Sequence, residues 1–163
     1  MPDTSTEVAL ATTTLSSAAA TIDFTSISSA YTDLRLVITC TFNTGTYPLV
    51  TLNNDSATNY SRTQIIGNGT AATSARSVNI AQMFGPVSTS SSIPTLGTAD
   101  FFNYAGSTFK TSLWTASSDM NGSGTVTRTV CLWRSTAAIN RITLTADSGT
   151  FAIGTTATLY GIL

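Results

Sequence analysis

This sequence contains no histidine, and charged residues make up only 9% of its 163 residues. Histidine is the most common general base, the usual partner of a serine or cysteine nucleophile, and the most common ligand of transition metals. Its absence argues against hydrolases built on those nucleophiles and against a histidine metal centre. We therefore expect a protein that is not an enzyme and that uses no cofactor or metal.

Carboxylates remain as candidate acid–base groups, because a glycosidase needs only a pair of them. They are Asp3, Glu7, Asp23, Asp33, Asp55, Asp100, Asp119 and Asp147. Most lie in or beside segments rich in Asn, Gly and Ser, so we expect Asx turns and strand ends instead of a catalytic pair. The segment 53–56 offers oxygen ligands but lacks the spacing of an EF-hand calcium loop.

Positive charge is also sparse. The seven basic residues stand singly along the chain and form no stripe that could neutralise a phosphate backbone, which argues against nucleic-acid binding. They are Arg35, Arg62, Arg76, Lys110, Arg128, Arg134 and Arg141. With a formal net charge of −1, copies of such a chain repel each other little, which favours a homo-oligomer.

Only two cysteines occur, Cys40 and Cys131, and they form no CxxC pair. Two interpretations stay open: both are buried thiols, or they form one long-range disulfide. The first residues lack the basic and apolar regions of a secretory signal, and no apolar run approaches the roughly 20 residues of a membrane span. We expect synthesis in a reducing cytoplasm, which favours reduced thiols, and no membrane partner.

Apolar and polar residues alternate through much of the chain. Hydrophobic residues make up 42% of it, enough for one domain with a real core, and threonine is frequent, which favours strands. In residues 34–42 every second side chain is apolar, so one face should enter a core. Residues 125–133 carry bulk on both faces, which is typical of a strand covered on both sides or lying at a subunit contact.

Further strands are expected at 8–15, 21–27, 49–52, 60–66, 76–80, 100–104, 109–116, 141–146 and 156–162. Turn-forming residues at 43–45, 53–55, 67–69, 121–124 and 147–149 separate them. Residues 16–20 and 135–140 have the composition for a helical turn, and the low-complexity segment 88–94 should form a surface loop. This pattern predicts an all-β fold, a jelly-roll-like antiparallel β-sandwich. Residues 1–163 should form one domain, with residues 1–7 as an extended N-terminal arm.

Candidate contact residues are aromatic or basic, because rings stack on the apolar faces of sugars and anchor protein interfaces. The alternative for the rings is burial in the core of a thin sandwich. The candidates for partner or glycan contact are Tyr60, Arg62, Tyr104, Trp114, Trp133 and Arg134.

Several short stretches together resemble a family of small Ser/Thr-rich structural proteins of tailed bacteriophages, described as virion or tail-associated proteins. In chain order, these stretches are residues 22–27, 31–37, 52–55, 59–61, 67–69, 103–104, 110, 132–139 and 159–162. Related sequences often place a histidine shortly after the Asn59-Tyr60 pair, whereas this chain has Ser61-Arg62-Thr63-Gln64. A metal or pH role for that histidine is therefore not carried over.

The resemblance implies a virion protein at the capsid surface or on a tail appendage, and it implies no catalytic site. We expect a capsid decoration protein or appendage subunit that acts by docking on other virion proteins, as a homo-oligomer with a trimer favoured. The trimer rests on the resemblance alone. The alternative is a tail-fibre module that binds a carbohydrate receptor on the host surface.

Overall fold

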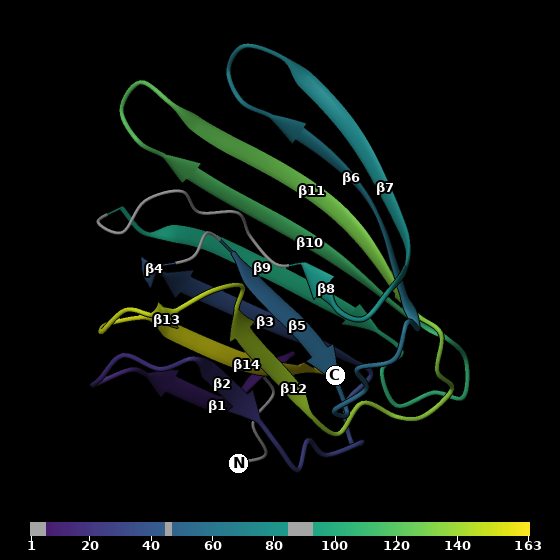
Figure 1. The fold of residues 1–163 in the computed structure, drawn as a ribbon. Coiled ribbons are helices and arrows are strands. Elements are labelled where there is room, and N and C mark those ends of the chain that lie inside the picture. Colours follow the sequence, from purple (N-terminus) through teal and green to yellow (C-terminus); the bar gives the residue numbers. More distant parts are fainter. Residues whose placement is uncertain (1–5, 45–46, 85–92) are drawn as a thin grey trace.

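In a computed structural model the chain forms two antiparallel β-sheets packed face to face, with a short third sheet beside them (Figure 1). The structure describes residues 6–44, 47–84 and 93–163. Within these ranges there is no helix, and hence none that could cross a membrane. The prediction of an all-β antiparallel sandwich is therefore confirmed.

The large sheet has eight strands in the spatial order β1-β14-β3-β9-β10-β11-β6-β7. Their bounds, in that order, are Glu7–Thr14, Thr156–Ile162, Asp33–Cys40, Thr95–Phe102, Lys110–Asp119, Gly124–Trp133, Tyr60–Gly67 and Ala72–Ile80. The small sheet has the order β2-β12-β5-β8. Its strands span Thr21–Phe24, Ile142–Ala146, Pro48–Leu52 and Met83–Phe84, and a further pair joins β4 (Phe42–Thr44) to β13 (Thr150–Phe151).

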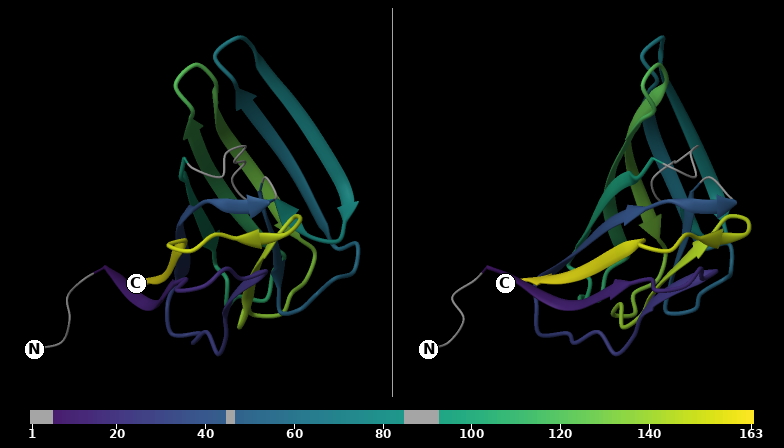
Figure 2. Two further views of the ribbon diagram at one scale, coloured as in Figure 1. Left: turned by 60° about the vertical axis from the view of Figure 1, so that its left-hand side comes forward. Right: turned by 90° about the vertical axis from the view of Figure 1, so that its left-hand side faces the viewer.

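Apart from two hairpins that both join the large sheet, the chain alternates between the two main sheets, except that β5 and β8 both lie in the small one. These hairpins, β6–β7 and β10–β11, lengthen the large sheet beyond its first four strands. Figures 1 and 2 show that both hairpins project beyond the edge of the small sheet. The projecting strands therefore have much less of the sandwich packed against them than β3 and β14 do.

The alternation seen in the sequence positions the core. Leu34, Leu36, Ile38, Cys40 and Phe42 are all at most 1% exposed, as predicted. Aromatic pairs fill the space between the sheets. Phe42 packs on Phe151 with ring centroids 5.1 Å apart, and Phe101 meets Trp114 edge-on at 5.9 Å.

Turn residues behave largely as expected from their chemistry. Asn53, Asn54 and Asn121 adopt the positive φ that asparagine tolerates better than most residues. The expected turn at 43–45 is wrong for Asn43 and Thr44, which pair with β13 as part of β4. Neither 16–20 nor 135–140 is helical. Residues 1–5 of the expected arm, Gly45, and residues 88–92 of the expected loop lie outside the described residues.

Both cysteines are buried and neither forms a disulfide, which confirms the first of the two interpretations. Cys40 lies on β3 and Cys131 on β11, with β9 and β10 between them. Three strand spacings of about 4.8 Å put them at least ~14 Å apart. A disulfide needs Cα atoms within about 7 Å, so these two cannot form one in this fold. Burial also raises the pKa of the Cys40 thiol to about 12, which makes it a poor nucleophile.

Candidate interaction surface

The outer face of the large sheet, which points away from the small sheet, carries an unusual concentration of apolar side chains. Strand register defines this face, because directly paired residues share a side of the sheet. One row across it runs through Thr63, Val130, Leu113, Asp100 and Arg35. Parallel rows place Thr111 between Leu132 and Phe102 on one flank, and Ser117 between Val126 and Leu96 on the other.

Exposed apolar residues gather on the half of this face built by β6, β11, β10 and β9, with polar residues between them. Its most exposed large side chains are Ile65 (61%), Leu96 (50%), Phe102 (46%), Val126 (62%) and Val130 (42%). Leu113 and Leu132 are half-buried between them. We call these seven residues the apolar face. The row of Arg128, Thr115 and Thr98 crosses the set between Val130 and Val126, so the apolar residues are concentrated here but not continuous. A concentration of exposed apolar side chains on one face points to an interaction site.

β11 explains how this face arises. Its inward residues Thr127, Thr129, Cys131 and Trp133 are buried, whereas Val126 and Val130 face outward and are exposed. The interpretation that both sides of this strand are covered is therefore wrong for the isolated chain. Its alternative, a strand that lies at a subunit contact, stays a prediction.

A charged hollow overlaps the apolar face and extends from β11 across the outer face to β1. Arg35 forms ion pairs with Asp100 (2.7 Å) and Glu7 (3.6 Å). The hydrogen bond that its Nε donates to Asp100, together with the negative charge of Asp100, raises the pKa of the Arg35 guanidinium. Arg128 donates a hydrogen bond to the Thr115 hydroxyl at 2.9 Å. These side chains line a shallow hollow of about 640 Å³, together with Tyr160. We call it the charged hollow.

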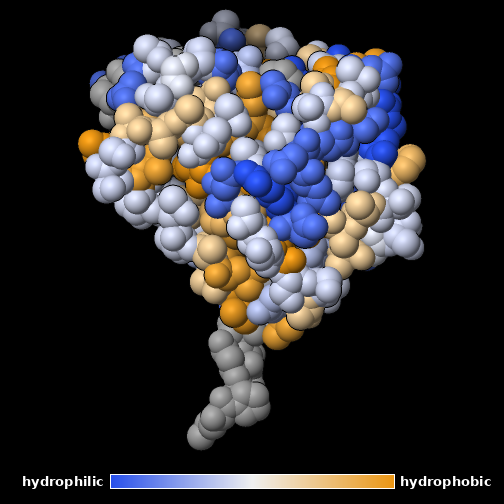
Figure 3. Space-filling model, turned by 60° about the horizontal axis from the view of Figure 1, so that its bottom comes forward, coloured by the Kyte–Doolittle hydropathy of each residue, from blue (hydrophilic) through white to orange (hydrophobic). Residues whose placement is uncertain are grey.

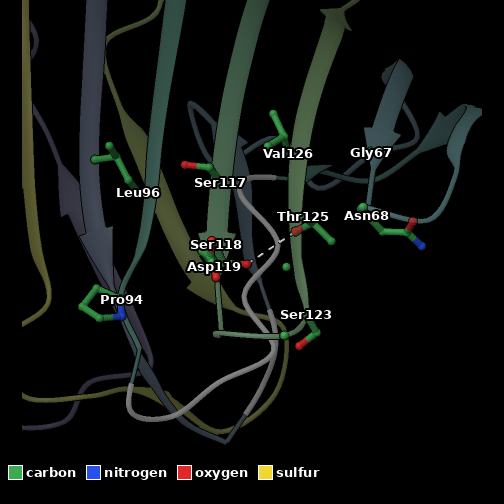
Figure 4. A pocket seen from close by; sticks show the side chains of 13 residues that line it. Gly67, Asn68, Pro94, Leu96, Ser117, Ser118, Asp119, Ser123, Thr125 and Val126 are labelled. Atoms are coloured by element: carbon green, nitrogen blue, oxygen red, sulfur yellow. Dashed lines mark hydrogen bonds between the residues drawn. The ribbon is translucent and has the colours of Figure 1, made fainter.

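A second hollow, of about 630 Å³, lies where the apolar face reaches the hairpin tips. Figure 4 shows Leu96, Ser117 and Val126 side by side on three neighbouring strands, with Asp119 and Ser123 below them in the turn of β10–β11. Asp119 accepts a hydrogen bond from the Asn121 N–H, so its carboxylate shapes this turn. The outer face is thus hollowed along its length.

The outer face of the small sheet differs in chemistry. Its strands alternate with threonine outward, and Asp23 there accepts hydrogen bonds from both Arg141 (2.7 Å) and Thr143 (2.5 Å). In the space-filling view of Figure 3, hydrophilic surface crosses the molecule as a band between hydrophobic patches. None of the exposed large apolar residues in the described part of the chain lies on β2, β12 or β5, whereas five of them lie on the outer face of the large sheet.

The four aromatic candidates from the sequence are not on either outer face. Tyr60, Tyr104, Trp114 and Trp133 are each at most 2% exposed. A ring in the core cannot stack on a sugar, so the glycan contact expected of these four is corrected to the core alternative. Inward alternation on β6, β10 and β11 is the physical reason for the burial of Tyr60, Trp114 and Trp133. Tyr104 lies in the turn after β9, where its hydroxyl donates to the Ser28 carbonyl.

Trp133 and Tyr60 instead organise the turn after β5. Their rings stack with centroids 6.3 Å apart, and the Trp133 indole N–H donates to Asp55 Oδ2 at 2.7 Å. Asn59 donates to the same oxygen, and the Ala57 N–H donates to Oδ1. Burial would raise the pKa of the Asp55 carboxyl, but these hydrogen bonds outweigh it and hold the pKa below its ordinary value. The Asp55 carboxylate therefore serves the turn and is not turned toward a metal.

The two basic candidates keep part of their surface. Arg62 is half-buried and donates to Ser77 Oγ at 3.3 Å, and burial lowers the pKa of its guanidinium. Arg134 donates to the Thr58 carbonyl (2.5 Å) and to Asn79 Oδ1 (2.9 Å). Both tie neighbouring segments together, and a partner contact through either stays a prediction.

No catalytic arrangement forms around the single lysine in the described part of the chain. Lys110 is buried, and its ammonium donates to the carbonyls of Gly106 (2.6 Å), Thr108 (2.5 Å) and Thr136 (3.4 Å). Ser112 lies two residues along the same strand face but accepts its hydrogen bond from the Trp114 indole. Nor do three or more acidic or cysteine side chains of the described residues gather as metal ligands.

The residues of the apolar face were missed as a site by sequence reasoning, although one signal was present. Bulk on both faces of residues 125–133 pointed to a second contact beyond the core. Ile65, Leu96 and Phe102 carried no such signal, because their neighbours on the face come from distant parts of the chain.

No family model, no curated protein and no solved structure is significantly similar to the chain.

Proposed function

We propose that this protein is a non-enzymatic structural subunit of a bacteriophage particle, a capsid decoration or appendage protein that docks through the outer face of its large sheet. The observation that carries the proposal is the apolar face, where residues such as Val126, Val130 and Ile65 remain more than two-fifths exposed. Burying such surface against a neighbouring subunit is favourable by about 25 cal/mol per Å². Docking of this kind requires no catalytic group.

The order of the strands supports a virion role. We infer that β1, β14, β3 and β9 facing β2, β12, β5 and β8 form a jelly roll, because the chain crosses between the sheets in the sequence that this fold requires. Jelly rolls are typical of viral capsid and lectin domains. On this basis β6–β7 and β10–β11 are insertions into the jelly roll, and together they carry much of the apolar face. The resemblance to phage structural proteins points the same way.

The test is sedimentation velocity of the purified protein over a dilution series. We expect a homo-oligomer, with a trimer favoured by the resemblance. The double variant Val126→Glu/Val130→Glu should shift the protein to smaller species, because charges would be buried in the contact. Ile153→Glu is the matched control, since Ile153 is 67% exposed but lies in the turn between β13 and β14.

Association of the double variant as strong as that of the wild type would contradict docking through this face. A wild-type protein that stays monomeric over the whole series would contradict the homo-oligomer.

The second candidate is a carbohydrate-binding module of a tail fibre, and the charged hollow favours it. Arg128 and Asp100 offer charged hydrogen-bonding groups there, and Tyr160 offers a ring for stacking. Calorimetric titration with host surface polysaccharide tests this candidate. Tyr160→Ala should abolish binding, whereas Phe109→Ala should not, because Phe109 is exposed outside the hollow.

A further inference from the structure

The edge strand β7 has the features of a strand that pairs with another chain. It spans Ala72–Ile80 at one end of the large sheet, with β6 as its only neighbour in the sheet order. Residues 72–76 are exposed on both sides of the sheet. The strand contains no proline and, apart from Arg76, no charge. Natural proteins usually protect such edges, because unpaired backbone groups bind other strands.

Hydrogen-bond alternation shows which backbone groups of β7 face outward. The Arg134 N–H donates to the Asn59 carbonyl (2.9 Å), one step beyond the Trp133–Tyr60 pair. In an antiparallel ladder bonded and non-bonded pairs alternate, so Arg62, Gln64 and Ile66 turn their backbone groups toward β7.

Their partners Ser77, Ala75 and Thr73 therefore bond to β6. The hairpin turn gives the same alternation, because the Asn68 N–H donates to the Ala71 carbonyl at 3.2 Å. The backbone N–H and C=O groups of Ala72, Ser74 and Arg76 consequently point away from the sheet. Within the described ranges, no hydrogen bond reaches these outward groups.

We propose that β7 pairs antiparallel with β7 of a second copy of this chain, about a twofold axis at Ser74. In this register Ser74 faces its own copy, and Ala72 faces Arg76 of the other chain. All three outward residues then exchange both backbone hydrogen bonds, six in total across the axis. The two arginines stay four residues apart along the paired strands, so like charges do not meet.

The opposite edge of the large sheet is a poorer match for the same contact. Strand β1 has a register shift between Ala9 and Ala11, which breaks the regular spacing of its backbone groups. The regular segment of β7, from Ala72 to Ser77, has no such shift. Pairing of β7 with itself therefore forms more hydrogen bonds than pairing of β7 with β1.

Amide hydrogen exchange at low and high protein concentration tests this register directly. It is best measured in the Val126→Glu/Val130→Glu background, so that docking through the apolar face does not contribute. The amides of Ala72, Ser74 and Arg76 should gain protection as concentration rises. Those of Thr73, Ala75 and Ser77 should be protected at every concentration, because β6 already bonds them.

Ser74→Pro and Ser74→Val form a matched pair of variants. Proline removes the outward N–H, which an edge strand tolerates, whereas valine keeps it. We expect Ser74→Pro to weaken dimerisation about thirtyfold, because two hydrogen bonds are lost per dimer. Ser74→Val should dimerise like its parent, and circular dichroism verifies the fold of both. Unprotected amides at Ala72, Ser74 and Arg76 at high concentration, or undiminished dimerisation of a folded Ser74→Pro variant, would overturn the proposal.

Discussion

Leu36 lies in the middle of β3 and is completely buried between the sheets. Leu36→Ala removes several buried carbon atoms and leaves a cavity, so we expect the free energy of unfolding to fall by about 2–5 kcal/mol. Chemical denaturation followed by tryptophan fluorescence measures this change. Thr39→Ala on the exposed side of the same strand should cost less than about 1 kcal/mol. Equal losses from the two variants would show that the inward face of β3 is misassigned.

Asp55 links acid sensitivity to a single turn. Its pKa is lower in the folded protein than in the unfolded chain, so its contribution to stability is present above the unfolded pKa of about 4. That contribution is lost as the pH falls through the folded pKa. Asp55→Asn turns an N–H donor toward the donors of Trp133 or Asn59, and we expect a loss of about 1–3 kcal/mol at neutral pH.

The pH profile distinguishes this role of Asp55 from simple packing. The stability difference between Asp55→Asn and the wild type should shrink below about pH 4, as the native carboxylate takes up its proton. Thermal unfolding at a series of pH values measures it. Asp119→Asn is the control, because Asp119 is exposed and an asparagine oxygen can still accept from the Asn121 N–H. A difference that stays constant down to pH 2 would contradict the assigned role.

At the scale of elements, Lys110 joins the β9–β10 connection to the segment after β11. Its ammonium bonds carbonyls at Gly106, Thr108 and Thr136, and burial lowers the pKa of its amine. Lys110→Met keeps the apolar stem but leaves these carbonyls without their donor, so we expect a loss of about 3 kcal/mol. Arg76→Met, at an exposed cation, should change stability by less than about half as much. Urea unfolding measures the free energy of unfolding of both variants. Equal losses would argue against a stabilising role for the three hydrogen bonds of Lys110.

The strands that sequence reasoning located are those with alternating apolar residues, such as residues 34–42 and 125–133. It missed the first half of β9, because the inward residues there are Thr95, Gly97 and Ala99, whose small side chains leave no hydrophobic pattern. It also missed β13, a strand of two residues that exists only through its pairing with β4. Short and small-residue strands depend on distant partners, which local patterns do not record.

The interaction surface was harder to predict for a related reason. Alternation tells which residues share a side of one strand, but not which side is covered. Residues 125–133 carry bulky side chains on both sides of the strand. Only the position of the small sheet decides that Trp133 is buried and Val130 is exposed. The apolar face forms when β6, β9, β10 and β11 align, and these strands are contributed by three separate parts of the sequence.

For the molecule as a whole, we expect binding without turnover. Arg35 pairs with both Glu7 and Asp100, the two carboxylates that share the charged hollow. Both carboxylates are thus held by one guanidinium, whereas the two carboxyl groups of a glycosidase flank the scissile bond of the substrate. Incubation with capsule or lipopolysaccharide from a susceptible host should therefore produce no new reducing ends. Sustained release that Asp100→Asn abolishes would require a catalytic function.

The pairing of β1 with β14 also determines when the large sheet can form during synthesis of the chain. Glu7 lies opposite Ile162, and β3 needs the same late strand on one side and β9 on the other. β14 must emerge from the ribosome before β1 or β3 can pair with it. Contacts between segments so distant in sequence make folding slow. The β6–β7 and β10–β11 hairpins can pair earlier, because each joins segments that are neighbours in the sequence. We therefore expect the two hairpins to pair earlier than β1, β3 and β14, and these hairpins carry much of the surface that we propose for docking.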